Sequence, residues 1–148
     1  MTKKTIWVID DDPIYQIIIN KTIQRFGLFS AISTFKNGKI ALDALLQLLD
    51  NDTALPDIIL LDINMPVMDG YACTEWIKEN YPNIQVLALS MFEEDTAVIK
   101  MLKAGAGGYV LKESKPQDLY RAIQEIKEKG LYLNDMVTGK IIRILQQG

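Results

Sequence analysis

The sequence predicts an α/β protein in which a parallel sheet is covered by helices on both faces. Three observations favour this doubly wound architecture. Strand-like and helix-like segments alternate along the chain, and the connections between them are short. The run Ile58–Leu61 is continuously apolar and ends at Asp62, as expected for a strand buried on both faces. Repeated strand–helix–strand units form right-handed crossovers, which place successive strands parallel in one sheet.

Five segments have the composition and length of buried strands. They are Thr5–Asp10, Phe29–Thr34, Ile58–Asp62, Ile84–Ser90 and Gly108–Leu111. Apolar residues at helical spacing separate and follow these strands. They predict helices near Ile14–Phe26, Gly38–Leu49, Tyr71–Asn80, Thr96–Lys103 and Pro116–Lys129.

Several helix ends are also predicted by single residues. Pro116 suits the first turn of the last of these helices, with Ser114 as its expected cap and Gly130 at its end. Gly27 ends the first helix in the same way. After Gly130 the alternation stops, and a short apolar stripe predicts one further helix. The stripe consists of Val137, Ile141, Ile144 and Leu145.

The composition is that of a soluble globular domain. The chain has 148 residues, of which 49% are hydrophobic and 24% charged, so it can bury a core and is too apolar to be disordered. A net charge of -3 argues against direct binding of nucleic acid by this segment. The apolar runs are strand-sized and the N-terminus has no secretory signal, so we expect a cytoplasmic protein without membrane contact.

Two residue types limit the chemistry that the chain can perform. Cys73 is the only cysteine, which excludes an internal disulfide and favours a packing role on a helix. The chain contains no histidine. It therefore has neither a histidine base, nor a histidine metal ligand, nor a phosphohistidine of its own.

Polar side chains stand where predicted strands end. Asp10 and Asp11 close the first strand, Asp62 the third and Ser90 the fourth, and Lys112 follows the fifth. In a parallel sheet these ends meet along one edge. Three carboxylates there repel one another, and Mg²⁺ is the hard cation that such oxygens suit. With a lysine and a hydroxyl nearby, the set fits a phosphoryl group arriving on a carboxylate.

This pattern resembles the receiver domain of two-component response regulators. The resemblance covers about residues 5–129, and it implies a receiver domain at residues 1–130 with a flavodoxin-like sheet of strand order 2-1-3-4-5. Residues 131–148 would then be a C-terminal helix or the start of a linker to an output domain. The motifs are Asp10-Asp11, Asp62 within Asp-x-x-Met-Pro-x-x-Asp-Gly, Ser90, Tyr109 and Lys112.

The resemblance implies a role for each acidic residue. Asp62 would be the phosphoacceptor, which forms an acyl phosphate with a phosphohistidine donor on a sensor kinase or a phosphotransfer protein. Asp11 and Asp62 would bind Mg²⁺ directly. Asp10 would bind it through water, and Asn64 through its backbone carbonyl.

The resemblance also implies how the remaining residues would respond to the phosphoryl group. Lys112 would pair with it, Ser90 would move to hydrogen-bond it, and Tyr109 would turn inward behind Ser90. This movement would alter an output surface and could cause homodimerisation. The chain would catalyse only its own phosphorylation and dephosphorylation, so it would not be an enzyme in the usual sense.

Each residue taken singly has a simpler interpretation. Asp12 and its acidic neighbours could cap the next helix, and Asp62 could start a turn. Ser90 could be an ordinary strand-end hydroxyl, Lys112 a solvated charge and Tyr109 a half-buried aromatic. Only the joint pattern favours the functional interpretation.

Two residues depart from the common receiver pattern. Met91 follows Ser90 where many receivers have a small residue, and we expect it to shield an acyl phosphate from water. Glu113 follows Lys112 where many receivers have a proline with a cis bond. Since a cis bond before another residue costs roughly 3 kcal/mol, we predict a trans bond here.

The resemblance leaves the output open. The segment Gly105–Ser114 resembles receivers that precede a helix-turn-helix DNA-binding domain, which favours control of transcription through a domain outside this chain. Alternatively, the receiver stands alone or acts by docking without phosphorylation. A Mg²⁺-dependent aspartyl-phosphate phosphohydrolase fits less well, because Asn64 occupies the position of its general acid and the 148 residues leave little room for a substrate-covering cap domain.

Overall fold

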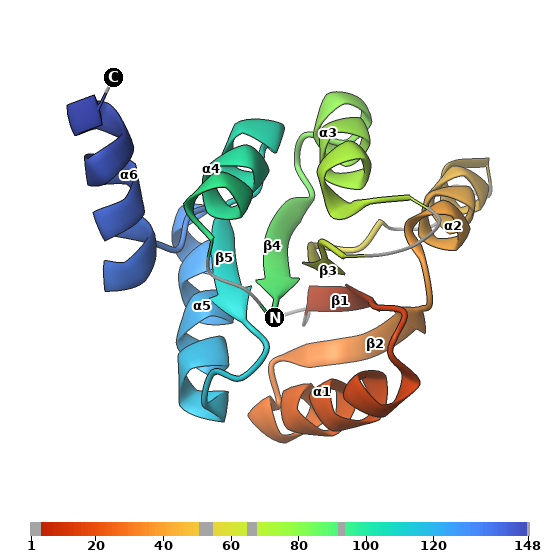
Figure 1. The fold of residues 1–148 in the computed structure, drawn as a ribbon. Coiled ribbons are helices and arrows are strands. Elements are labelled where there is room, and N and C mark those ends of the chain that lie inside the picture. Colours follow the sequence, from red (N-terminus) through yellow and green to blue (C-terminus); the bar gives the residue numbers. More distant parts are fainter. Residues whose placement is uncertain (1–3, 51–54, 65–67, 92–93, 148) are drawn as a thin grey trace.

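The structure, a computed structural model, describes residues 4–50, 55–64, 68–91 and 94–147. Figure 1 shows a central sheet with helices on either side. All strand pairs are parallel, and the order is β2-β1-β3-β4-β5. The doubly wound fold and the order 2-1-3-4-5 are therefore confirmed. The strands are β1 (Lys4–Ile9), β2 (Phe29–Phe35), β3 (Ile58–Asp62), β4 (Gln85–Ser90) and β5 (Gly108–Leu111).

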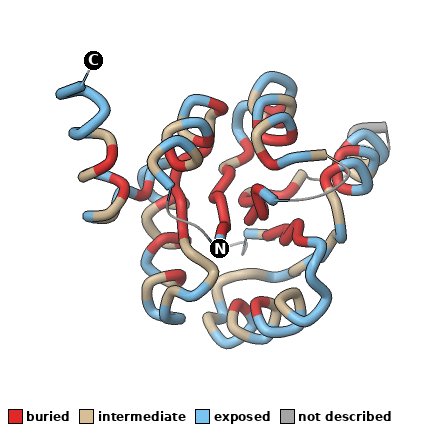
Figure 2. The backbone as a smooth tube through the Cα atoms, in the orientation of Figure 1, coloured by how far each residue is buried: buried red, intermediate tan, exposed pale blue. Residues whose placement is uncertain are grey.

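Two helix layers bury the two faces of this sheet, as the colouring in Figure 2 shows. One face packs against α1 (Pro13–Phe26) and α5 (Pro116–Lys129). The other packs against α2 (Gly38–Asp50), α3 (Gly70–Asn80) and α4 (Asp95–Ala104). Cys73 is fully buried in this second layer, which confirms its packing role.

The predicted strands and helices are confirmed, with ends that agree or differ by one residue. Asp12 caps α1, since its Oδ1 accepts hydrogen bonds from the amides of Ile14 and Tyr15 at 3.0 and 3.3 Å. Gly27 and Gly130 end α1 and α5 in the left-handed conformation, with φ values of 67° and 73°.

The prediction that Ser114 caps α5 is wrong. The cap residue is Lys115, and no side chain accepts a hydrogen bond there. Lys115 precedes Pro116, and the proline ring forces the residue before it into an extended conformation, so the helix begins only at Pro116. Ser114 instead belongs to the preceding turn, where its amide donates to the carbonyl of Leu111 at 3.0 Å.

The predicted C-terminal helix is present as α6 (Asp135–Gln147), which Figure 1 shows beside α4 and α5. Val137 is fully buried and joins the core on the α4 side of the sheet. A shallow apolar groove runs between α6 and α4 and is lined by residues of both helices. Whether this helix also begins a linker remains a prediction. Within the part of the chain that the structure describes, no helix is both long and apolar enough to cross a membrane.

Candidate functional site

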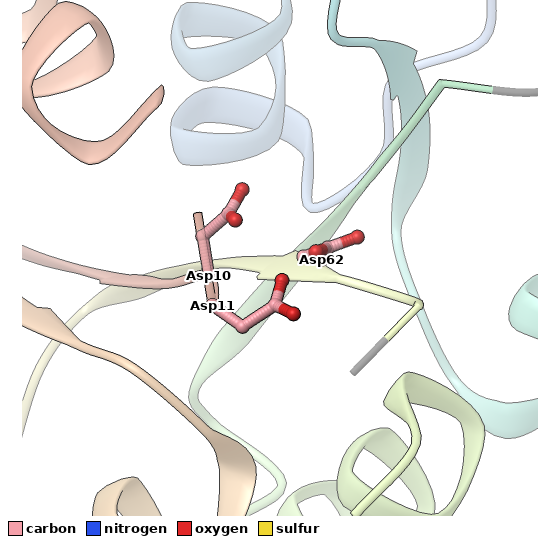
Figure 3. Close-up of side chains that lie close together, drawn as sticks. All are labelled: Asp10, Asp11 and Asp62. Carbon is pink, nitrogen blue, oxygen red and sulfur yellow. The ribbon is translucent and has the colours of Figure 1, made fainter. Parts of the chain in front are cut away.

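Three carboxylates meet at the carboxyl edge of the sheet, as Figure 3 shows. Asp10 and Asp11 follow β1, and Asp62 is the last residue of β3. These strands are neighbours, and Ile9 lies opposite Leu61, so the next residue of each strand falls at the same edge. One oxygen from each carboxylate lies within 4.8 Å of the other two. The predicted convergence of Asp10, Asp11 and Asp62 is therefore present.

The three carboxylates differ in burial and in contacts. Asp10 is fully buried, with its Oδ1 accepting a hydrogen bond from the amide of Asp12 at 2.8 Å. Asp62 is only 3% exposed, and its Oδ1 accepts from the amide of Asn64 at 3.1 Å. Asp11 is exposed to solvent. A cation at this edge would thus meet one open carboxylate and two that the protein holds in place.

Lys112 reaches the same cluster from the turn after β5. Its Nζ lies 2.7 Å from Asp10 Oδ2 and 3.3 Å from Asp62 Oδ2. Burial alone would lower the pKa of Lys112, but the hydrogen bond and charge of Asp10, together with the charge of Asp62, raise it. The ammonium therefore stays charged. The Lys112–Glu113 peptide bond is trans, as predicted.

The surroundings of Asp62 oppose the ionisation of its carboxyl group. Burial, and then the charge of Asp10, raise its pKa to about 6, against the lowering effects of the Asn64 amide and of Lys112. The positive charge of Lys112 therefore does not fully offset the negative charges of the carboxylates. A divalent cation would supply the missing charge, so the donor set fits a metal ion such as Mg²⁺.

Ser90 and Tyr109 lie behind this edge, on the strands β4 and β5. Both side chains are fully buried. The Tyr109 hydroxyl is hydrogen-bonded to the Ser90 side chain, while burial raises the pKa of Tyr109. Tyr109 is therefore already turned inward, and Ser90 links it to the strand end next to Asp62.

Gly70, the first residue of α3, packs closely against the residue that follows β3. The amide of Gly70 donates to the carbonyl of Ile63 at 3.2 Å, and a Cβ on Gly70 would lie 2.5 Å from the Ile63 Cα. Only glycine permits this approach. Asp69 caps α3 by accepting from the amide of Ala72 at 2.8 Å. Met65 and Pro66 of the predicted motif lie outside the described residues.

Tyr15 is a site residue that the sequence analysis did not identify. Its ring centroid lies 4.6 Å from Lys112 Nζ. Burial, then the charges of Asp10 and Asp62, raise the pKa of its hydroxyl, so the ring stays neutral. Tyr15 and Met91 also line a hollow of about 270 Å³ beside Lys112. The sequence did contain a signal for this role, because Tyr15 is an aromatic residue in the first turn of the helix that follows the acidic pair.

The sequence of the chain also matches that of a known protein family. The model described as the response regulator receiver domain matches residues 6–124. The chain belongs to the response regulator receiver family. Receivers of this family interact with histidine kinases or other phosphodonors and bind Mg²⁺ at an acidic pocket, where this receiver has Asp10, Asp11 and Asp62.

Similar proteins agree with this assignment. The receiver is 30% identical to the transcriptional regulatory protein DegU of Brevibacillus brevis over 95% of this chain, and 30% identical to the nitrate/nitrite response regulator NarL of Escherichia coli over 90%. It spans 57% and 59% of their lengths. The solved signal receiver domain of a NarL response regulator from Mycobacterium tuberculosis superposes with a TM-score of 0.74 at 26% identity. That match covers 87% of this chain and 99% of the other.

Proposed function

We propose that this receiver accepts a phosphoryl group on Asp62 from the phosphohistidine of a sensor kinase or a phosphotransfer protein. The observation that carries the proposal is the ion pair of 3.3 Å between Asp62 and Lys112 inside the acidic cluster. A nucleophilic carboxylate beside a fixed ammonium combines the attacking oxygen with a charge that can stabilise the transferred group. With a pKa of about 6, Asp62 is mostly ionised at neutral pH.

Mg²⁺ would be held by Asp11 and Asp62 directly, by Asp10 through water and by the backbone carbonyl of Asn64. The contacts of Asp10 support this division. One of its oxygens accepts from the Asp12 amide and the other faces Lys112, which leaves a water-mediated role. The bound ion would neutralise negative charge on the phosphoryl oxygens.

The transfer itself requires few protein groups. An oxygen of Asp62 attacks phosphorus, the bond from phosphorus to the donor nitrogen breaks, and the donor histidine keeps that electron pair. Lys112 then pairs with the phosphoryl oxygens. Ser90 exchanges its contact with Tyr109 for one with the phosphoryl group, and this exchange would shift a two-state equilibrium of the output surface. Water later attacks phosphorus, the bond from phosphorus to the Asp62 oxygen breaks, and inorganic phosphate leaves, which restores the Asp62 carboxylate.

The proposed readout is control of transcription in the cytoplasm, through an output domain or through homodimerisation. Its support is indirect: the relatives DegU and NarL are named as a transcriptional regulatory protein and as a response regulator. We place the receiver domain at residues 1–130 and treat residues 131–148 as a C-terminal helix that can connect to such a domain. The receiver itself would not touch nucleic acid.

The test is incubation with Mg²⁺ and acetyl phosphate, followed by intact mass measurement. The wild-type protein should gain one phosphoryl group, and Asp62→Asn should gain none. Asp43→Asn, at an exposed position on α2, is the matched control and should behave as wild type. Turnover of added phosphomonoesters would instead indicate a phosphohydrolase. Absence of both reactions would indicate a receiver that docks without phosphorylation.

A further inference from the structure

We propose that Tyr15 is a positioning residue that holds the Lys112 ammonium beside Asp62 through the face of its ring. The distance of 4.6 Å from Nζ to the ring centroid is within the range in which an aromatic face attracts a cation. The inference deepens the proposed function, and it rests on that function in so far as Lys112 is taken to serve phosphoryl transfer.

The ring is held in place by the start of α1. The Tyr15 amide donates to Asp12 Oδ1 at 3.3 Å. The adjacent Gln16 donates through its Nε2 to the carbonyls of Asp10 at 2.6 Å and Phe35 at 2.9 Å. The first turn of α1 is thereby fixed to the carboxyl ends of β1 and β2, so the Tyr15 ring has a defined position over the site.

Lys112 is fixed from the opposite side. Its backbone amide donates to the carbonyl of Ser90 at 2.8 Å, which ties the turn after β5 to the end of β4. Its side chain is 12% exposed and extends across the strand ends to Asp10 and Asp62. The ammonium thus lies between two carboxylates and an aromatic face that come from different elements.

The contact of Lys112 with the ring differs from its contacts with the carboxylates in how it changes during phosphoryl transfer. A cation would compete with Lys112 for Asp10 and Asp62, and phosphorylation would remove the negative charge of the attacking Asp62 oxygen. Both events weaken the ion pairs. The Tyr15 ring carries no net charge to lose, and a ring face does not occupy the three N–H groups of the ammonium in the way that oxygen acceptors do. It therefore keeps Nζ within reach while those N–H groups turn to the phosphoryl oxygens.

Tyr15 is half-buried and also packs against the core beneath α1, so packing must be separated from the ring–cation contact. Tyr15→Phe retains the ring, whereas Tyr15→Leu retains an apolar side chain without a ring. Tyr120→Leu is the matched control, because Tyr120 is also half-buried and its ring faces Phe26 with a centroid distance of 5.1 Å rather than Lys112.

The first measurement is the rate at which acetyl phosphate and Mg²⁺ phosphorylate Asp62. Tyr15→Phe and Tyr120→Leu should stay within about twofold of wild type, and Tyr15→Leu should be slower by about two- to thirtyfold. In a Lys112→Met background, Tyr15→Leu should cause no further loss, since the ring acts through the lysine. The proposal would be overturned if Tyr15→Phe and Tyr15→Leu slowed phosphorylation equally. It would also be overturned if Tyr15→Leu slowed phosphorylation as much in the Lys112→Met background as in the wild type.

The second measurement does not depend on phosphorylation. A ring face shields nuclei above it, so the side-chain signals of Lys112 should be shifted upfield in the NMR spectra of the wild type and Tyr15→Phe. The shift should vanish in Tyr15→Leu, with Lys112→Met providing the assignment. A shift that persists in Tyr15→Leu would refute the role of Tyr15. A wild-type protein that shows the shift but takes up no phosphoryl group would refute only the proposed function.

Discussion

Lys140 Nζ lies 2.6 Å from Asp95 Oδ1, so α6 is ion-paired to the first residue of α4. The Lys140 side chain is 8% exposed, while that of Asp95 is 38% exposed. The hydrogen bond from Lys140 lowers the pKa of Asp95, and Arg143 adds a weaker contact at 3.6 Å. This pair and the buried Val137 attach the C-terminal helix to the side of the receiver.

Replacing Lys140 by methionine should loosen α6 without unfolding the sheet. The apolar stem is retained and Asp95 can be hydrated, so we expect amide hydrogen exchange in α6 to become about two- to fivefold faster. Exchange in β1 and β3 should not change. Lys129→Met is the control, because Lys129 forms an exposed pair with Glu125 at 4.0 Å. Equal protection of α6 in both variants would contradict this role for Lys140.

Asp62 should make the metal-free protein less stable as pH rises from about 4 to 6. Burial, then Asp10, raise its pKa from 3.8 to about 6. In that window the folded state binds more protons than the unfolded state, so the free energy of unfolding falls with increasing pH, by at most about 3 kcal/mol. Denaturant unfolding at a series of pH values in the presence of EDTA measures this slope.

The same carboxylate should link Mg²⁺ binding to pH. A bound cation favours the ionised form of Asp62, so the stabilisation by Mg²⁺ should be larger at pH 7.5 than at pH 5. Asp62→Asn should lose both the slope in EDTA and most of the Mg²⁺ effect. Parallel pH profiles for this variant and the wild type would show that another group is responsible.

Asp11→Ala should weaken Mg²⁺ binding more than Asp10→Ala does. Asp11 is exposed and is assigned a direct ligand role, whereas both oxygens of Asp10 already face protein groups. Calorimetric titration of each variant with Mg²⁺ gives the two dissociation constants to be compared. Folding of each variant is checked by its thermal unfolding, because Asp10 is fully buried. Equal losses of affinity would contradict the assignment.

Met91→Ala should shorten the lifetime of the acyl phosphate several-fold. The Met91 side chain lines the hollow next to Lys112 and is 68% exposed. We expect it to cover part of the approach of water to the site. The decay of the phosphorylated mass after removal of the donor gives the rate. Leu131→Ala, also at an exposed apolar position, is the control. An unchanged decay rate would remove the shielding hypothesis.

The strands and helices were predictable because their signals are local. A buried strand such as Ile58–Asp62 has a continuous apolar run, and α5 carries an apolar stripe at helical spacing. Cap residues were predictable where one residue type is required, as at Gly27. The prediction for Ser114 was wrong because composition favoured a serine cap, whereas the backbone restriction before Pro116 moved the cap to Lys115.

The acidic cluster could also be predicted from the sequence. Asp10, Asp11 and Asp62 end strands that a parallel sheet aligns at one edge, so topology alone brings them together. By contrast, Tyr15 over Lys112 and Lys140 beside Asp95 join residues with no shared pattern. Their contacts depend on the angle of α1 and on the side of the sheet where α6 returns. Sequence periodicity determines which face of an element is buried, but only the packed structure determines which distant side chains meet there.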